Sequence, residues 1–179
     1  GFACDEGVRR NQGRTGAVDG PLALRRALAN LAWHPTLPLY DAGTVRCDDG
    51  DLDAAHERLA AAVSAIVQAG HLPLVLGGGH ETAYGHWLGL ARAHAGKRIG
   101  IVNFDAHFDL RQADTATSGT PFAQIAAACH TLGQPFRYLC LGVAETANTR
   151  ALFDTAARLG AEWRLDSDMT PWHLAEARQ

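Results

Sequence analysis

Hydrophobic and polar positions follow two patterns along this chain, short apolar runs and longer stretches with helical spacing. Between Asp51 and Ala69 the apolar side chains recur every three or four residues, which predicts an amphipathic helix. Asp51 or Asp53 suits its N-cap, and Gly70 suits the position just past its end. Similar spacing predicts further helices over about 81–95, 122–132 and 149–159.

The apolar runs predict strands, because each is short and is bounded by turn residues. They cover residues 37–43, 71–76, 98–104 and 136–142. The runs lack clean alternation of apolar and polar residues and are separated by helices, which is typical of a parallel sheet covered on both faces. The pattern therefore predicts an α/β fold.

Composition and charge exclude several classes of protein. A chain of 179 residues with 47% hydrophobic residues can build one domain with a sizeable core. Its formal net charge of −3 gives no general attraction to nucleic acid or to an anionic membrane, and no apolar run reaches the length of a membrane span. The four cysteines form no C-x-x-C pair, so we expect free thiols and a cytoplasmic location.

Ionisable side chains follow the run at 98–104, in the sequence Asp105-Ala106-His107-Phe108-Asp109. An extended backbone would place Asp105, His107 and Asp109 on one face, since strand side chains alternate. Two carboxylates and an imidazole leaving an apolar strand are costly unless they are paired or bind a cation. The alternative is a polar turn in which these side chains bond to the backbone.

A second polar segment, Gly77-Gly78-Gly79-His80, follows the run at 71–76. Its glycines allow close backbone approach and positive φ. Taken alone, it suits a phosphate-binding loop or a tight turn, although it lacks the endings of the common nucleotide motifs. Because the carboxyl ends of parallel strands meet at one edge of a sheet, His80 and the segment from Asp105 to Asp109 together favour a metal site.

These two segments resemble the first two metal motifs of the arginase/ureohydrolase family. The flanking sequence is similar to the formimidoylglutamase subgroup of that family, and the resemblance runs along essentially all of the chain. The residues that carry it are Asp5-Glu6-Gly7-Val8, Asn11-Gln12-Gly13-Arg14, Gly20-Pro21 with Arg25, and Ser118-Gly119-Thr120-Pro121-Phe122.

The resemblance implies a three-layer αβα fold with a parallel sheet and two Mn²⁺ ions at the strand ends. His80 would bind one ion together with Asp109, His107 would bind the other, and Asp105 would bridge them. The implied enzyme is a hydrolase of linear amidines that acts in histidine degradation. A hydroxide between the ions would attack N-formimino-L-glutamate and release L-glutamate and formamide, so no catalytic side chain is assigned.

The substrate would carry two carboxylates, which Asn11 and Arg14 are suited to bind. The alternative for Arg14 is a solvated loop arginine. Ser118 stands where some family members have a histidine, which argues against an arginase or agmatinase and leaves the general acid unidentified. The substrate is thus a small molecule, and the family resemblance allows a homo-oligomer.

A third family motif, D-x-D-x-x-D-P, is absent. Asp166-Ser167-Asp168 offers its first part, but Glu162–Leu165 before it lacks an apolar strand, so we expect a loop entering a helix at Thr170-Pro171. We therefore expect residues 1–179 to be the N-terminal and central part of one arginase-like domain, with an incomplete sheet, partial metal occupancy and little turnover. Another ureohydrolase, or a truncated non-catalytic metal-binding relative, remains the alternative.

Overall fold

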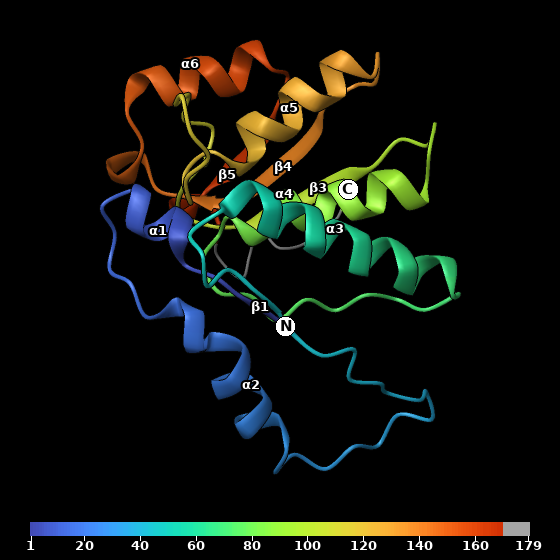
Figure 1. Ribbon diagram of the computed structural model, residues 1–179. Coiled ribbons are helices and arrows are strands. Elements are labelled where there is room, and N and C mark those ends of the chain that lie inside the picture. Colours follow the sequence, from blue (N-terminus) through green and yellow to red (C-terminus); the bar gives the residue numbers. More distant parts are fainter. Residues whose placement is uncertain (170–179) are drawn as a thin grey trace. The chain divides into compact units, whose positions relative to one another are not determined.

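The computed structural model describes residues 1–169 of the chain (Figure 1). These residues form two compact units. The first consists of Gly1–Ala95 with Ala113–Pro121, and the second of Gly96–Gln112 with the chain from Phe122 onward. Every strand pair in the described part of the chain is parallel. The predicted α/β class with parallel sheets is therefore confirmed.

The first unit combines a two-stranded parallel sheet with four α-helices. Strand β1 pairs with β2, and helices α3 and α4 pack side by side (Figure 1). Phe2 and Cys4 of the N-terminal segment are buried against the apolar face of α3, in a core that includes Leu52 and Leu59. The elements are β1 (Phe2–Ala3), α1 (Glu6–Arg10), the short 3-10 helix η1 (Ala17–Asp19), α2 (Gly20–Leu28), β2 (Val45–Arg46), α3 (Leu52–Gln68) and α4 (Thr82–Ala93).

Helix α3 confirms the clearest helical prediction. The Asp51 side chain caps it by accepting a hydrogen bond from the backbone N–H of Ala54 at 2.9 Å. Gly70 follows the helix with a φ of 81°, a left-handed conformation that favours glycine at this position. Helix α4 likewise falls within the predicted range 81–95, and it begins directly after His80 and Glu81.

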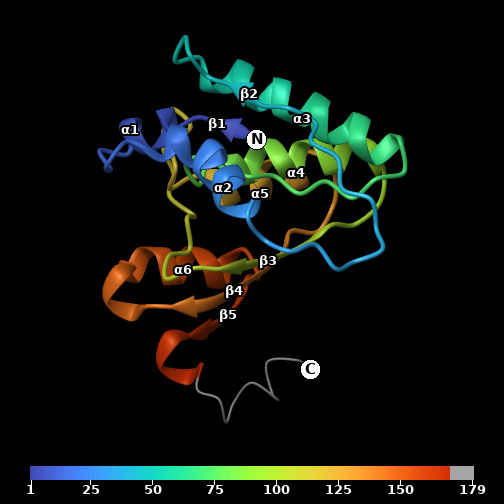
Figure 2. The same ribbon diagram turned by 90° about the horizontal axis from the view of Figure 1, so that it is seen from below.

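The second unit holds a three-stranded parallel sheet in the order β3-β4-β5 (Figure 2). Phe108 is fully buried, and its ring meets those of Phe153 and Trp163 edge-on, with centroid distances of 5.0 and 5.5 Å. Phe108 itself belongs to the segment from Asp105 to Asp109, so this aromatic cluster anchors that segment. The elements are β3 (Gly100–Phe104), α5 (Pro121–Thr131), β4 (Arg137–Val143), η2 (Glu145–Ala147), α6 (Arg150–Arg158), β5 (Glu162–Leu165) and η3 (Asp166–Asp168).

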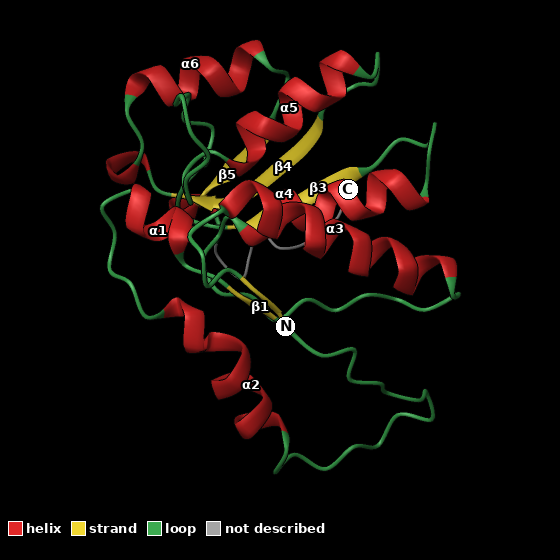
Figure 3. Cartoon of the chain, in the orientation of Figure 1, coloured by secondary structure: helices red, strands yellow, loops and turns green. Residues whose placement is uncertain are grey.

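Two predicted strands are wrong. Residues 37–43 and 71–76 are loops (Figure 3). Pro38 and Pro73 interrupt these runs and lack the N–H that a sheet ladder requires. The second segment makes one strand-like contact, since the backbone N–H of Phe2 donates to the carbonyl oxygen of Leu76 at 2.8 Å. Apolar character alone therefore did not distinguish a strand from an extended loop here.

The opposite error occurs at Glu162–Leu165, which forms β5 and pairs with β4, so that Cys140 lies opposite Trp163. Its residues alternate between exposed and partly buried positions, as in a strand at the edge of a sheet, and not as a continuous apolar run. Asp166–Asp168 then forms the 3-10 turn η3. The predicted helix entry at Thr170-Pro171 lies outside the described residues. Within those residues, no helix is long and apolar enough to cross a membrane.

Candidate metal centre

The segment from Asp105 to Asp109 leaves the end of β3 as a turn. One Asp105 carboxylate oxygen, Oδ1, accepts a hydrogen bond from the backbone N–H of His107 at 2.9 Å. Asp109 has a φ of 47°, in the left-handed region that few residues other than glycine adopt. The extended backbone predicted for these residues is therefore wrong, because the Asp105 side chain folds the chain into a turn that an aspartate favours.

His107 is about half exposed, and its Nδ1 lies 3.2 Å from Oδ1 of Asp105. A carboxylate can only accept, so Nδ1 donates this hydrogen bond, and the other ring nitrogen, Nε2, takes no part in it. A carboxylate that holds one ring nitrogen while the other faces a metal is a common arrangement in metalloproteins. The metal-binding role of His107 remains a prediction.

Three side chains of the second unit hold the backbone of this turn, and the sequence analysis missed their role. The Asn148 side chain bonds the N–H of Phe108 and the carbonyl of Ala106, at 3.0 and 2.8 Å. The hydroxyl of Tyr138 donates to the carbonyl oxygen of Phe108 at 3.0 Å, and the Cys140 thiol contacts the carbonyl oxygens of Asp105 and His107. Burial raises the pKa of both Tyr138 and Cys140, so both remain protonated donors at neutral pH.

In the first unit, His80 follows three glycines that leave no room for side chains. The backbone N–H of Gly79 donates to the carbonyl oxygen of Cys4 at 2.8 Å, and a Cβ on Gly78 would clash with that same oxygen. None of the three glycines has a positive φ. Close approach, of Gly78 to Cys4, of Gly79 to Glu81 and of Gly77 to Thr82, and not a left-handed backbone, is therefore the reason for glycine at this loop.

Glu81, the residue after His80, is fully buried. Its Oε1 accepts a hydrogen bond from the backbone N–H of Gly7 at 2.8 Å, which ties the loop before α4 to the start of α1. Burial raises the pKa of Glu81 above its ordinary value. Oε2 has no hydrogen-bond partner among the described residues. The sequence offered no signal for this burial, since Glu81 reads as an ordinary first-turn glutamate.

The predicted substrate-binding residues also lie in the first unit. Asn11 is half-buried and ends α1, with its backbone N–H bonded to the carbonyl oxygen of Gly7. Arg14 is exposed on the loop that follows. Oδ2 of Asp5 holds that loop by accepting from the backbone N–H of Gly16 at 2.6 Å. Their role in substrate binding remains a prediction.

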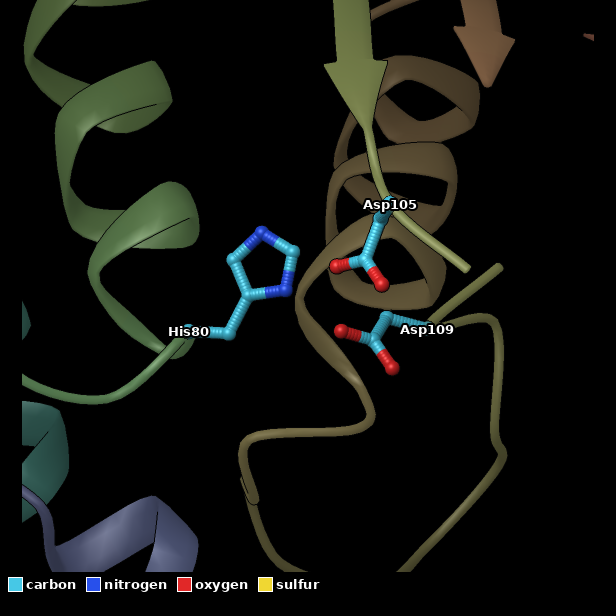
Figure 4. A group of neighbouring side chains, drawn as sticks. All are labelled: His80, Asp105 and Asp109. Atoms are coloured by element: carbon cyan, nitrogen blue, oxygen red, sulfur yellow. The ribbon is translucent and has the colours of Figure 1, made fainter. Parts of the chain in front are cut away.

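Figure 4 shows the side chains of His80, Asp105 and Asp109, each half-buried. All three are residue types that ligate metals, His80 in the first unit and Asp105 and Asp109 in the second. Among the described residues, Asp166 and Asp168 belong to no such group. Two carboxylates and one imidazole form a donor set that suits Mn²⁺, because this ion accepts both oxygen and nitrogen ligands. The residue types therefore fit the metal that the resemblance implies.

Relatives of known name match nearly the whole chain. A formimidoylglutamase of Chromobacterium violaceum is 76% identical over 178 residues, which cover 99% of this chain and 58% of that protein. A formimidoylglutamase of Aeromonas hydrophila is 62% identical over 176 residues, covering 97% of this chain and 56% of that protein. The chain thus spans a little over half the length of these relatives.

Solved structures of related proteins have a similar fold. A Trypanosoma cruzi formiminoglutamase crystallised with Mn²⁺ matches with a TM-score of 0.87 and 28% identity, over 99% of this chain and 62% of that one. An arginase of Bacillus subtilis matches in fold, with a TM-score of 0.78 and 22% identity over 98% of this chain and 65% of that one. The arginase-like α/β fold is therefore confirmed. The arginase family model covers residues 1–178, and the chain belongs to the arginase family.

Proposed function

We propose that the protein of which these residues are part is a formimidoylglutamase. It would hydrolyse N-formimino-L-glutamate to L-glutamate and formamide, a step of histidine degradation. The observation that carries this proposal is the 76% identity to the formimidoylglutamase of Chromobacterium violaceum over 99% of the chain. The matched part of that relative is 58% of its length, so the activity belongs to the whole protein.

His80, Asp105 and Asp109 are the residues that we propose hold one Mn²⁺. His107 would bind a second ion, with Asp105 bridging the two. The proposal is supported by the residue types of the group and by the half-buried position of each of its side chains. It is also supported by the Mn²⁺ in the Trypanosoma cruzi formiminoglutamase that the chain resembles. For His107, the support is the hydrogen bond that leaves Nε2 available.

The Mn²⁺ ions, when bound, supply Lewis acidity that polarises the amidine and makes water a nucleophile at neutral pH. The residues of this chain position the reactants. Oδ1 of Asp105 keeps the proton of His107 on Nδ1, and so fixes the orientation of the ring. Asn11 and Arg14 would bind the carboxylates of the glutamate moiety, with the planar guanidinium of Arg14 matching one carboxylate.

Two Mn²⁺ ions carry four positive charges, and the carboxylates of Asp105 and Asp109 would supply only two negative ones. A complete centre therefore needs further carboxylates, and we propose that residues outside this chain supply them. Residues 1–179 would form the N-terminal and central part of one arginase-like domain. This is supported by the single family model that spans residues 1–178, and so both compact units.

The test compares the protein with its Asp105→Asn variant and with an Asp154→Asn control. Asp154 is an exposed aspartate on α6. Formamide release from N-formimino-L-glutamate and bound manganese are both measured. We expect Asp105→Asn to lose most of the metal and at least about 10²-fold of the activity, because Asp105 is one of the residues that would hold the ions. Full activity of Asp105→Asn would contradict the proposed centre, and Asp154→Asn should behave like the parent protein.

The same assay distinguishes the two alternative functions, another ureohydrolase and a non-catalytic relative. Turnover of arginine, agmatine or a guanidino acid in place of N-formimino-L-glutamate would indicate another ureohydrolase. Manganese binding without turnover of any of these substrates would indicate a non-catalytic relative. The identities to two formimidoylglutamases favour the first proposal.

We also propose a cytoplasmic location and retain a homo-oligomer as a prediction. The location is supported by four free cysteines, of which Cys4, Cys129 and Cys140 are buried. Fractionation of cells tests the location. Light scattering on the purified protein tests the oligomer, which a monomeric mass at micromolar concentration would contradict.

A further inference from the structure

The Asn148 side chain bonds three backbone groups in the second unit. It is 8% exposed, and it lies between η2 and α6, forty residues after Phe108. Its Oδ1 accepts from the backbone N–H of Phe108 at 3.0 Å. Its Nδ2 donates to the carbonyl oxygens of Ala106 and Ala144, at 2.8 and 2.9 Å. Both amide protons and the amide oxygen are therefore satisfied by backbone groups.

These bonds fall on both sides of His107. Because the amide oxygen faces an N–H and the amide nitrogen faces two carbonyls, only one orientation of the side chain satisfies every group. The Ala106 carbonyl is held a second time by the backbone N–H of Ala144 at 3.0 Å. Asn148 thus joins the turn after β3 to the segment after β4, and it fixes the peptide groups that flank His107.

The turn needs such support, because its own conformation is unfavourable. Asp109 has a φ of 47°, a left-handed conformation that is less favourable for a residue with a side chain than for glycine. A network of hydrogen bonds that fixes the backbone on either side of His107 opposes relaxation of Asp109. A single backbone conformation then limits the positions that the carboxylates of Asp105 and Asp109 can take.

We propose that Asn148 is a positioning residue for the candidate metal centre, acting through the backbone of residues 105–109 and without contacting the ion or the substrate. The part of this inference that concerns Mn²⁺ rests on the proposed function. The part that concerns the backbone rests on the hydrogen bonds of Asn148 alone. The two parts are tested by separate measurements.

The backbone is tested first, by hydrogen exchange in the metal-free protein. Asn148→Ser keeps a short polar group but cannot span Ala106 and Phe108, and it should raise amide exchange in residues 105–109 at least tenfold. Ile125→Ala removes a buried side chain of α5 in the same unit and serves as the control for general destabilisation. It should leave the ratio of exchange in this segment to exchange in β4 unchanged. Parent-like exchange in Asn148→Ser would overturn the proposal.

Manganese binding is tested second, by titration with Mn²⁺ alone. We expect Asn148→Ser to weaken binding about 10- to 100-fold, as is typical when a group that orients a metal ligand is removed. Ile125→Ala should stay within about twofold of the parent, even with a similar drop in thermal midpoint. If Asn148→Ser binds Mn²⁺ as the parent does, the positioning role is wrong. If the parent itself binds no Mn²⁺, the proposed function fails, and the exchange result alone decides the role of Asn148.

A second variant keeps the test decisive if Asn148→Ser does not fold. Tyr138→Phe removes the hydroxyl that bonds the Phe108 carbonyl and keeps the ring, which stacks on Phe122 with a centroid distance of 4.4 Å. Its effect on exchange and on Mn²⁺ affinity should have the same direction as that of Asn148→Ser and be smaller. Unchanged exchange and unchanged affinity in Tyr138→Phe would overturn the proposal that backbone bonds to this turn set the ligand geometry.

Discussion

The imidazole of His56 donates a hydrogen bond from Nε2 to the main-chain carbonyl oxygen of Glu81 over 2.9 Å. A carbonyl can only accept, so the proton of the neutral ring is on Nε2. Nδ1 has no partner among the described residues, and the ring packs against Phe2 and Tyr84. Helix α3 is thereby joined to the residue that follows the candidate ligand His80.

Acidification should destabilise the protein through His56. Burial lowers the pKa of His56 below its ordinary value of 6.5, because the charged ring would lose its hydration. A group whose folded pKa is depressed binds its proton more readily in the unfolded chain. The stability is therefore full above about pH 6.5 and decreases as pH falls below that value. Urea denaturation of the metal-free protein between pH 8 and pH 5 measures this decrease.

His56→Phe tests the assignment, since it keeps a ring between Phe2 and Tyr84 and removes the titrating group. We expect a lower midpoint than the parent at pH 8 and a smaller decrease towards pH 5. His34→Gln changes an exposed histidine and should keep the slope of the parent. A parent-like slope in His56→Phe would assign the pH dependence to other groups, first among them His86, whose pKa burial also lowers.

Glu6 should cause a second loss of folding stability, at lower pH than that of His56. The guanidinium groups of Arg9 and Arg10 hydrogen-bond its carboxylate and lower its pKa from 4.5 to about 2. Because the folded pKa lies below the unfolded one, this contribution is present above about pH 4.5 and is lost as pH falls towards 2. Glu6→Gln should lower the free energy of unfolding at pH 7 and make its acid dependence between pH 4.5 and 2 shallower. Equal slopes for variant and parent would contradict the assignment.

Phe108→Ala should be among the most damaging core substitutions in the second unit. The side chain is fully buried against Phe153 and Trp163, and truncation leaves a cavity that costs about 3–5 kcal/mol. Leu132→Ala, at a position that is 59% exposed, should cost less than about 0.5 kcal/mol. Chemical denaturation of both variants measures the difference. A cost below about 1 kcal/mol for Phe108→Ala would mean that the aromatic cluster closes over the cavity.

Gly78→Ala should affect both folding and metal binding. The added Cβ would clash with the carbonyl oxygen of Cys4, so the loop before His80 must move. We expect a loss of stability of about 1–3 kcal/mol, as for overpacked sites, and weaker Mn²⁺ binding. Gly100→Ala is the matched control, because its Cβ would meet nothing within 4 Å. Normal Mn²⁺ affinity in Gly78→Ala would show that this loop does not set the position of His80.

The sequence predicts those parts of the fold in which local pattern and local chemistry agree. Helix α3 has its apolar period, its aspartate cap and its terminal glycine in register, and it forms as predicted. Residues 71–76 have only apolar character, which an extended loop shares with a strand, and the prediction failed there. Strand β5 was missed because Glu162 and Arg164 lie on its exposed face, as is usual at the edge of a sheet.

The residues of the candidate site also fall into two groups, those that local motifs reveal and those that only the fold reveals. His80 lies in one short motif and Asp105, His107 and Asp109 in another, so the sequence shows both motifs, and the resemblance to the arginase family implies that they bind metal. Asn148 and Glu81 act through partners forty and seventy-four residues away, and no local pattern carries that information. Supporting residues of this kind become visible only when the chain is folded.

The hydrogen bond between Gly7 and Glu81 also constrains when the first unit can form. Residues 2–7 are made long before their partners, since the N–H of Gly7 bonds a carboxylate seventy-four residues later. At about 5–20 residues per second, a ribosome needs roughly 4 to 15 seconds to reach Glu81 after Gly7. For most of that interval the core around Phe2 and Cys4 is incomplete, because α3 (Leu52–Gln68), which covers them, is itself made only 45 to 61 residues after Gly7. The nascent chain should therefore expose this segment to chaperones until residue 81 has left the exit tunnel.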